Sequence, residues 1–200
     1  MIKTINTPLC DEVIRGLKIG DIVYLNGKLA TGRDEVFSRV ARGTQCPCNL
    51  SGGVIFHAGP IVRESGEYPG RHELVSIGPT TSIRMEKWAG DFIEKTGVKL
   101  MIGKGGMGGK TAEACRKYGA LHCVYPGGCA ALGAAQVTGI ENVFWRELGM
   151  GECIWVMEVS AFGPLIVSID TQGNNLFAEN AAHYTSRREA CMAPVVSYLC

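Results

Sequence analysis

The stretch SIGPTTSIRMEKWAGDFIEKTGVKLMIGKGGM, residues Ser76 to Met107, decides the fold. It contains the polar turn Gly78 to Ser82 and the start of a second polar turn, Gly103 to Gly109. Each turn follows an apolar run and precedes a helical pattern. Apolar residues recur at helical spacing from Ser82 to Thr96, so we expect an amphipathic helix there that ends at Gly97. Strand, turn and helix in this order predict an α/β fold with a mixed sheet and βα units at its centre.

Length and composition indicate one globular domain over residues 1–200. With 46% hydrophobic and 20% charged residues, such a chain can bury roughly 70% of the surface that it exposes when unfolded. The formal net charge of +1 gives no electrostatic reason to bind nucleic acid or an anionic membrane. The sequence shows neither a signal-peptide core nor an apolar run of the ~18 residues that span a bilayer. We therefore expect a soluble, cytoplasmic protein.

Nine cysteines are an odd number and cannot all pair within the chain. Cys46 and Cys48 are the only pair close in sequence, and their single intervening residue differs from the two-residue spacing of a redox or zinc pair. Buried thiols in a reducing compartment are the simplest interpretation. Four ligands at ordinary spacing cannot be assembled, so no metal site is predicted in this chain.

Towards the N-terminus the sequence predicts a hairpin and a helix. From Ile19 we expect a strand, a tight turn at Asn26-Gly27 and a second strand. Residues 30–43 then carry apolar side chains at helical spacing, which places Arg33 at a helix start. A cation there opposes the helix dipole unless an anion binds beside it. Pairing of Arg33 with the adjacent Asp34 is the simpler alternative.

The C-terminal part predicts more strands and a helical tail. Three strand-like runs cover Val143 to Trp145, Ile154 to Val159 and Pro164 to Ile169. The last closes on a turn at Asp170 to Asn174, which a polar helical tail follows. Residues 126–139 are rich in Gly and Ala, so we expect them to pack closely on another backbone or another subunit.

His57 lies at the end of a predicted buried strand in GVIFHAGPIV, residues 53–62, which is broken at Gly59-Pro60. A single histidine among apolar residues is more often a hydrogen-bonded core residue than a catalyst. We therefore expect His57 to have a structural role.

The glycine-rich turn formally approaches two phosphate-binding motifs and satisfies neither. Gly103, Gly105 and Gly108 have the spacing of a dinucleotide fingerprint. No Asp or Glu occurs in residues 121–140, where the acid that holds the ribose belongs. As a P-loop, the turn has Lys104 where the first glycine should stand. A nucleotide-binding enzyme is disfavoured, and the open N–H groups with one lysine predict an anion site of unspecified kind.

Six cationic or hydroxyl side chains lie at predicted element ends: Arg33, Thr80, Thr81, Ser82, Arg84 and Lys104. Each arginine could clamp a carboxylate in a two-point fork, and the lysine adds a point charge. The three hydroxyls precede a helix, where they can cap it or bind oxygen. Taken singly, each residue has a simple structural explanation. Their joint placement points to a small dianion, such as a dicarboxylate.

GPTTSIRM and LMIGKGGM, with TGRD upstream and FGPLIVSIDTQGNNL near the end, resemble the β subunits of iron–sulfur hydro-lyases. This family comprises L(+)-tartrate dehydratases and the C-terminal part of class I fumarases. The similarity runs from about Thr7 to Asn180. LGM at 148–150, HAGPIV at 57–62 and IDTQGNN at 169–175 are closer to the tartrate dehydratase branch. The resemblance implies a swivelling β/β/α domain with a mixed central sheet.

The resemblance also implies a partner. Such β subunits work with an α subunit that carries a [4Fe–4S] cluster, in a hetero-oligomer such as a heterotetramer. Dehydration of a C4 2-hydroxy dicarboxylate needs a Lewis acid on the leaving hydroxyl, which the partner's iron supplies. It needs a base for the proton next to a carboxylate, and fixed positive charge on the carboxylates. This chain alone is therefore expected to be inactive.

The resemblance assigns roles to the six side chains. The catalytic hydroxyl comes from Thr80, and substrate contacts come from Arg33, Thr81, Ser82, Arg84 and Lys104. A threonine hydroxyl is too weak a base by itself, and the family places the carboxylate that activates it on the partner. Phe37 stands where related sequences have a histidine, four residues after the arginine of TGRD. Whether that position supports Arg33 or only packs the helix stays open.

Three functions, two of them enzymatic, stay open at this point. We expect a hydro-lyase, that is a carbon–oxygen lyase, that converts L-tartrate to oxaloacetate. A fumarase β subunit, which interconverts fumarate and malate, is the first alternative. A non-catalytic subunit that binds an anion for assembly is the second.

Overall fold

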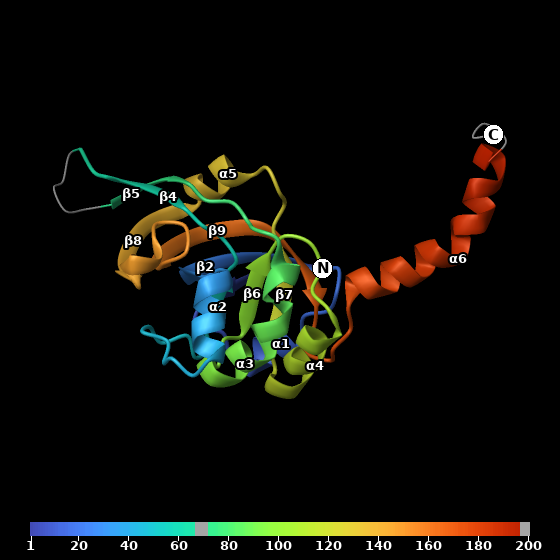
Figure 1. Ribbon diagram of the computed structural model, residues 1–200, viewed down its shortest axis with the longest axis horizontal. Coiled ribbons are helices and arrows are strands. Elements are labelled where there is room, and N and C mark those ends of the chain that lie inside the picture. The colour runs from blue at the N-terminus through green and yellow to red at the C-terminus, as the bar shows by residue number, and fades with distance from the viewer. Residues whose placement is uncertain (67–71, 197–200) are drawn as a thin grey trace.

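The computed structural model describes residues 1–66 and 72–196, with side chains described as far as residue 193 (Figure 1). Its centre is a closed ring of five strands, in the order β2 (Ile22–Thr31), β3 (Val54–Phe56), β6 (Leu100–Gly103), β7 (Leu121–Val124) and β9 (Ile154–Ile169). The first three pairings are parallel, whereas β9 pairs antiparallel with both β7 and β2. The predicted α/β fold with a mixed sheet is confirmed, and the sheet is a five-stranded barrel.

Two strands extend the ring and two form a separate ribbon. β1 (Ile2–Asn6) pairs with β2, and β8 (Val137–Phe144) pairs with β9. β4 (Ile61–Glu64) and β5 (His72–Ser76) form a two-stranded antiparallel sheet that projects from the body in Figure 1. The interior of the ring is filled by apolar side chains, among them Leu25, Phe56, Tyr125 and Phe162.

The helices lie outside the ring. They are α1 (Asp11–Arg15), α2 (Asp34–Ala41), α3 (Glu86–Thr96), α4 (Gly109–Tyr118), α5 (Ala130–Ala135) and α6 (Leu176–Val196), with two 3₁₀ helices, η1 (Ser82–Met85) and η2 (Arg146–Leu148). Helix α3 packs between α2 and α4, and α6 leads away from the body (Figure 1). A second apolar core lies between these three helices and the sheet. Among the described residues, no helix combines the length and the apolar character needed to cross a bilayer.

Glycines end two of the helices, and the one after α3 is the predicted Gly97. Gly97 follows α3 with φ +66° and Gly119 follows α4 with φ +63°, the left-handed conformation that a helix end favours and that glycine adopts without a steric penalty. The Gly- and Ala-rich segment packs closely on a backbone, as expected, because a Cβ on Gly133 would lie 2.6 Å from the carbonyl oxygen of Ile77.

The hairpin predicted at Asn26-Gly27 is wrong, because β2 continues through these residues. Gly27 has φ +93°, and the register with β9 shifts between Leu25 and Gly27. Asn26 is used for contacts between strands: its amide donates to Asn6 Oδ1 (3.1 Å), and its Oδ1 accepts from Ala161 N (2.7 Å). The pair therefore forms an irregularity inside one strand, where a bulge bends the chain around the barrel.

The three strand-like runs near the C-terminus form two strands, not three. The first belongs to β8, and the other two are joined in β9, which is 16 residues long. Positive φ angles at Ala161 (+49°) and Gly163 (+157°) mark the irregular point between the two runs. This length allows β9 to pair with β2, β7 and β8 and so to close the ring. The predicted polar helical tail is α6.

Candidate functional site

The two turns that frame the opening stretch are joined by their backbones. Lys104 N donates to Thr80 O (3.2 Å), and Ser82 N donates to Lys104 O (3.0 Å). Thr80 N in turn donates to the carbonyl oxygen of His57 (2.6 Å). The structure therefore brings Thr80, Thr81, Ser82 and Lys104 together at the end of β6.

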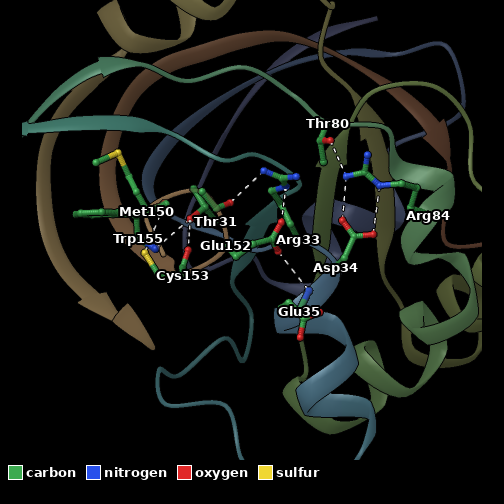
Figure 2. Close-up of polar contacts among 11 residues, drawn as sticks. Thr31, Arg33, Asp34, Glu35, Thr80, Arg84, Met150, Glu152, Cys153 and Trp155 are labelled. Atoms are coloured by element: carbon green, nitrogen blue, oxygen red, sulfur yellow. Dashed lines mark hydrogen bonds and ion pairs between the residues drawn. The ribbon is translucent and has the colours of Figure 1, made fainter. Parts of the chain in front are cut away.

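Arg84 binds a carboxylate of its own chain. Its Nε and Nη2 donate to Asp34 Oδ1 (3.2 Å) and Oδ2 (2.9 Å), and Nη2 also donates to Thr80 Oγ1 (2.9 Å) (Figure 2). The expected two-point fork exists, but its occupant is Asp34. Among the described residues Nη1 makes no hydrogen bond. Nη1 is therefore left for a ligand. The positively charged guanidinium lies beside the Thr80 hydroxyl.

Arg33 binds a different carboxylate, so the alternative in which it pairs with Asp34 is not the one observed. Arg33 occupies the N-cap position of α2 without a capping hydrogen bond from its side chain. Its Nε lies 3.1 Å from Glu152 Oε1, an ion-pair contact that is not aligned as a hydrogen bond. Its Nη1 donates to Gly151 O (3.3 Å). Glu152 Oε2 accepts from Glu35 N (3.3 Å), so the anion that the helix start favours is Glu152.

The turn that carries Glu152 is held firmly against β2 and β9. Trp155 Nε1 donates to Met150 O (2.9 Å), and Thr31 Oγ1 bridges Cys153 O (3.3 Å) and Trp155 N (3.0 Å) (Figure 2). Sequence reasoning missed Glu152, because it lies far along the chain from Arg33 and no local pattern connects the two. Only the closure of the barrel brings them into contact.

Lys104 differs from the two arginines. It is exposed, as is Thr81, and among the described residues it forms no ion pair. Its stem lies over Gly127, since a Cβ there would be 3.1 Å from Lys104 Cδ. Three cations and two carboxylates meet in this region, which leaves one positive charge for an anionic ligand.

The N–H groups that we expected to be open at the start of α4 are bonded to Glu86. Its carboxylate accepts from Gly108 N (2.7 Å), Lys110 N (3.1 Å) and Thr111 N (3.2 Å), and from Thr111 Oγ1 (2.6 Å). Glu86 was not predicted to have this role. An anion site at this helix start is therefore already filled by the protein itself.

Ser82 is fully buried and faces the interior. Its hydroxyl lies 3.0 Å from His57 Nδ1 and 3.3 Å from His122 Nε2. A direct contact of Ser82 with substrate stays a prediction, and it would require this hydroxyl to become exposed. His57 is also fully buried and has one hydrogen-bonded ring nitrogen, while its Nε2 has no partner among the described residues.

Burial lowers the pKa of both histidines. Loss of water, and then the nearby His122, keep the pKa of His57 well below 6.5, and burial lowers the pKa of His122 to about 3. Both rings are therefore neutral near neutral pH. Phe37 packs beside them: it stacks on Phe92 (4.0 Å between ring centroids) and meets His57 edge-on (5.1 Å). Phe37 has a packing role here.

The described cysteines form no metal site. Cys46 and Cys48 lie 3.7 Å apart at sulfur, and the hydrogen bond from Cys48 lowers the pKa of Cys46 to about 7. Across the described part of the chain, no group of three or more His, Cys, Asp or Glu side chains is placed to hold a metal ion.

Comparison with known proteins identifies the family. Residues 2–180 match the family described as fumarase C-terminus. The chain is 51% identical to the L(+)-tartrate dehydratase subunit beta of Escherichia coli strain K12, over 100% of this chain and 96% of that protein. It is 42% identical to a putative L(+)-tartrate dehydratase subunit beta of Methanocaldococcus jannaschii, over 86% of this chain and 89% of that protein.

A longer protein contains a related region. The chain is 37% identical to a putative fumarate hydratase class I of Geobacillus stearothermophilus, over 86% of this chain but 33% of that protein. This protein therefore belongs to the fumarase C-terminal family.

Proposed function

We propose that this chain is the β subunit of an L(+)-tartrate dehydratase, a hydro-lyase that converts L-tartrate to oxaloacetate. The observation that carries this proposal is 51% identity to such a β subunit along the whole chain. The second candidate is a fumarase β subunit, which is supported by 37% identity to a putative fumarate hydratase class I. The higher identity and the full coverage favour the tartrate dehydratase over the fumarase.

We assign the [4Fe–4S] cluster to an α subunit. The described residues of this chain do not fit a cluster, because Cys46 and Cys48 have no third ligand beside them. The chain's own contribution is to hold the substrate carboxylates and to supply a hydroxyl. The eight described cysteines are free, which is typical of a reducing compartment and supports a cytoplasmic location. A relative named subunit beta supports a hetero-oligomer with the α subunit, and we propose a heterotetramer.

Thr80 is the proposed catalytic residue, and its environment suits the role. Removal of a proton next to a carboxylate requires the threonine oxygen to act as a base, and its ordinary basic form is scarce at neutral pH. Arg84 Nη2 donates to Thr80 Oγ1 (2.9 Å), and a guanidinium at this distance stabilises an anionic oxygen. We infer that the main role of Arg84 is to stabilise the Thr80 oxygen, and that only its Nη1 is available to bind the substrate.

Lys104 and Arg33 are the proposed carboxylate-binding groups, with Thr81 beside them. Lys104 has its full charge available, whereas Arg33 shares its charge with Glu152 (3.1 Å). Abstraction of the proton builds negative charge on the substrate carboxylate, and fixed cations stabilise it. We further propose that the domain swivels against the α subunit, which would carry these side chains onto the bound substrate.

Coexpression with an α subunit under anaerobic conditions tests the function. We expect turnover of L-tartrate by the complex, slower turnover of fumarate and malate, and none by this chain alone. Thr80→Ala should abolish turnover, whereas the exposed loop variant Thr44→Ala should not. Activity of the isolated chain would contradict the proposal. Unchanged turnover in both Thr80→Ala and Lys104→Ala complexes would instead indicate a non-catalytic assembly subunit.

A further inference from the structure

A chain of four buried polar side chains runs beneath the two turns. It contains His57 after β3, Ser82 in η1, His122 in β7 and Ser168 in β9, and none of the four is exposed to solvent. The contacts are His57 Nδ1 to Ser82 Oγ (3.0 Å), Ser82 Oγ to His122 Nε2 (3.3 Å) and His122 Nδ1 to Ser168 Oγ (2.6 Å). Four elements distant in sequence are therefore linked through their polar groups.

One direction satisfies all the hydrogen bonds of this chain at the same time. Ser168 Oγ donates to His122 O (3.0 Å), so it accepts from His122 Nδ1–H. A neutral His122 with its proton on Nδ1 has a bare Nε2, which accepts from the Ser82 hydroxyl. Ser82 Oγ can then accept only from His57 Nδ1–H. Both imidazoles therefore carry their single proton on Nδ1.

This tautomer makes the unpartnered ring nitrogen of His57 an acceptor. With the proton on Nδ1, His57 Nε2 is a bare acceptor, and it makes no hydrogen bond to the described residues. A buried acceptor without a partner costs stability, and most buried polar atoms avoid this state. In this arrangement the single ring proton of His57 is used in the hydrogen bond that Nδ1 donates to Ser82 Oγ. Burial lowers the pKa of both rings, so neither is charged near neutral pH.

The same residues hold the proposed catalytic turn. The carbonyl oxygen of His57 accepts from Thr80 N (2.6 Å), and Ser82 N donates to the carbonyl oxygen of Lys104 (3.0 Å). The ring of His57 fixes Ser82, and its backbone fixes Thr80, so both ends of the Thr80–Ser82 turn depend on one histidine.

Gly103 gives independent evidence for this arrangement. A Cβ at Gly103 would lie 1.8 Å from Ser82 Oγ and 2.8 Å from His57 Nδ1, distances that real Cβ atoms do not show. Any other residue would separate the serine from the histidine. The first glycine of the Gly103–Gly109 turn therefore makes room for the hydrogen bond between His57 and Ser82.

We propose that His57 and His122 are positioning residues of the reaction, neutral Nδ1–H imidazoles that orient Ser82 and thereby fix Thr80 and Lys104. This inference rests on the proposed function in one respect, since it takes Thr80 and Lys104 as the groups that act on the substrate. Ser82 then contributes from inside the protein, by holding the turn.

Nitrogen-detected NMR of the ¹⁵N-labelled full chain tests the tautomers without any assay of activity. We expect both rings as neutral Nδ1–H tautomers, with shifts that do not change between about pH 6 and 9, since the lowered pKa values lie below this range. An Nε2–H tautomer at either ring, or titration of either ring in this range, would overturn the proposal.

Paired amide variants in the αβ complex test the positioning role. An asparagine amide can replace Nδ1 and a glutamine amide can replace Nε2, so His57→Asn and His122→Gln keep the bond to Ser82. His57→Gln and His122→Asn introduce the same amide groups at the other positions, where the amide cannot make the hydrogen bond to Ser82. We expect kcat to fall by about tenfold in the second pair, the factor of one lost hydrogen bond, with a smaller change in KM. Ser38→Ala, a buried hydroxyl on α2, is the control.

The outcomes separate the two proposals. Equal kcat values in the two pairs, with differences only in melting temperature, would show a purely structural role and overturn the inference. A wild-type complex without hydro-lyase activity would count against the proposed function alone. The tautomers seen by NMR would still decide whether the hydrogen bonds from His57 to Ser168 have the proposed direction.

Discussion

Arg33, Arg84 and Lys104 carry the same charge but differ in what they already bind. Arg84 is held by Asp34 and contacts Thr80, Arg33 lies against Glu152, and Lys104 has no ion pair among the described residues. These contacts give the three cations different roles, although the sequence alone would assign carboxylate binding equally to all three.

Asp34→Asn should release Arg84 from its fixed orientation. The asparagine amide keeps the shape of the side chain but offers one acceptor instead of two, and it removes the charge that pairs with Arg84. We expect kcat of the αβ complex to fall by about tenfold or more, with a smaller rise in KM, because Thr80 loses its positioned guanidinium. Asp91→Asn, an exposed position on α3, should leave kcat unchanged. Equal kinetics in the two variants would contradict the link between Asp34 and Thr80.

Lys104→Met should act mainly on substrate binding. The methionine keeps the stem over Gly127 and removes an ammonium whose charge no carboxylate of the described chain shares. We expect KM for L-tartrate to rise by about tenfold or more, as for the loss of a charge-assisted contact, with little change in melting temperature. Lys110→Met, also exposed, is the control. An unaltered KM would exclude Lys104 as a carboxylate-binding group.

At the scale of elements, α3 and α4 are joined by one carboxylate. Glu86, the first residue of α3, accepts four hydrogen bonds from Gly108, Lys110 and Thr111 at the start of α4. Gly108 must be glycine for this contact, because a Cβ there would lie 2.6 Å from Glu86 Oε1. At its Gly108 end, the glycine-rich turn therefore allows α3 and α4 to pack together.

Glu86→Ala should destabilise the fold. The substitution leaves the backbone N–H groups at the start of α4 without their acceptor, and we expect a loss of about 1–3 kcal/mol in the free energy of unfolding. Urea denaturation of the purified chain measures this difference. Glu94→Ala, on the exposed face of α3, should change stability by less than about 0.5 kcal/mol. Equal midpoints for the two variants would show that the cap contributes nothing.

At the scale of the whole molecule, the buried histidines couple folding to pH. The pKa of His122 is about 3 and that of His57 is well below 6.5 in the folded chain, because burial disfavours the charged rings. In the unfolded chain both titrate near 6.5. Below that pH the unfolded chain binds more protons, so stability is complete above pH 6.5 and is lost as the pH falls towards 3.

Denaturation of the chain between pH 7.5 and 5 should show this dependence. We expect the free energy of unfolding to fall by at most about 1.4 kcal/mol per pH unit for each histidine once the pH is below 6.5. The double variant His57→Asn with His122→Gln removes both titrating rings and should flatten the curve. A wild-type stability that stays constant over this range would contradict the burial of two neutral histidines.

The sequence predicted local features well, because neighbouring residues alone produce them. Gly97 and Gly119 end α3 and α4 by their left-handed conformation, and Arg33 stands at the start of α2 as its spacing indicated. The prediction failed at Asn26-Gly27, where a strong turn signal lies within the continuous strand β2. Contacts of Asn26 with Asn6 and Ala161 override the local preference there.

By itself the sequence determined the α/β class, the ends of the helices and the set of cations and hydroxyls at the two turns, since periodicity and glycine conformation are local properties. Only the tertiary structure decided how these groups pair. Closure of the barrel brings Glu152 to Arg33 and places Asp34 against Arg84. The bond from Ser168 Oγ to His122 O then sets the direction of the hydrogen bonds that run through the two histidines beneath Thr80. Such pairings depend on residues far apart in the chain, and no local pattern encodes them.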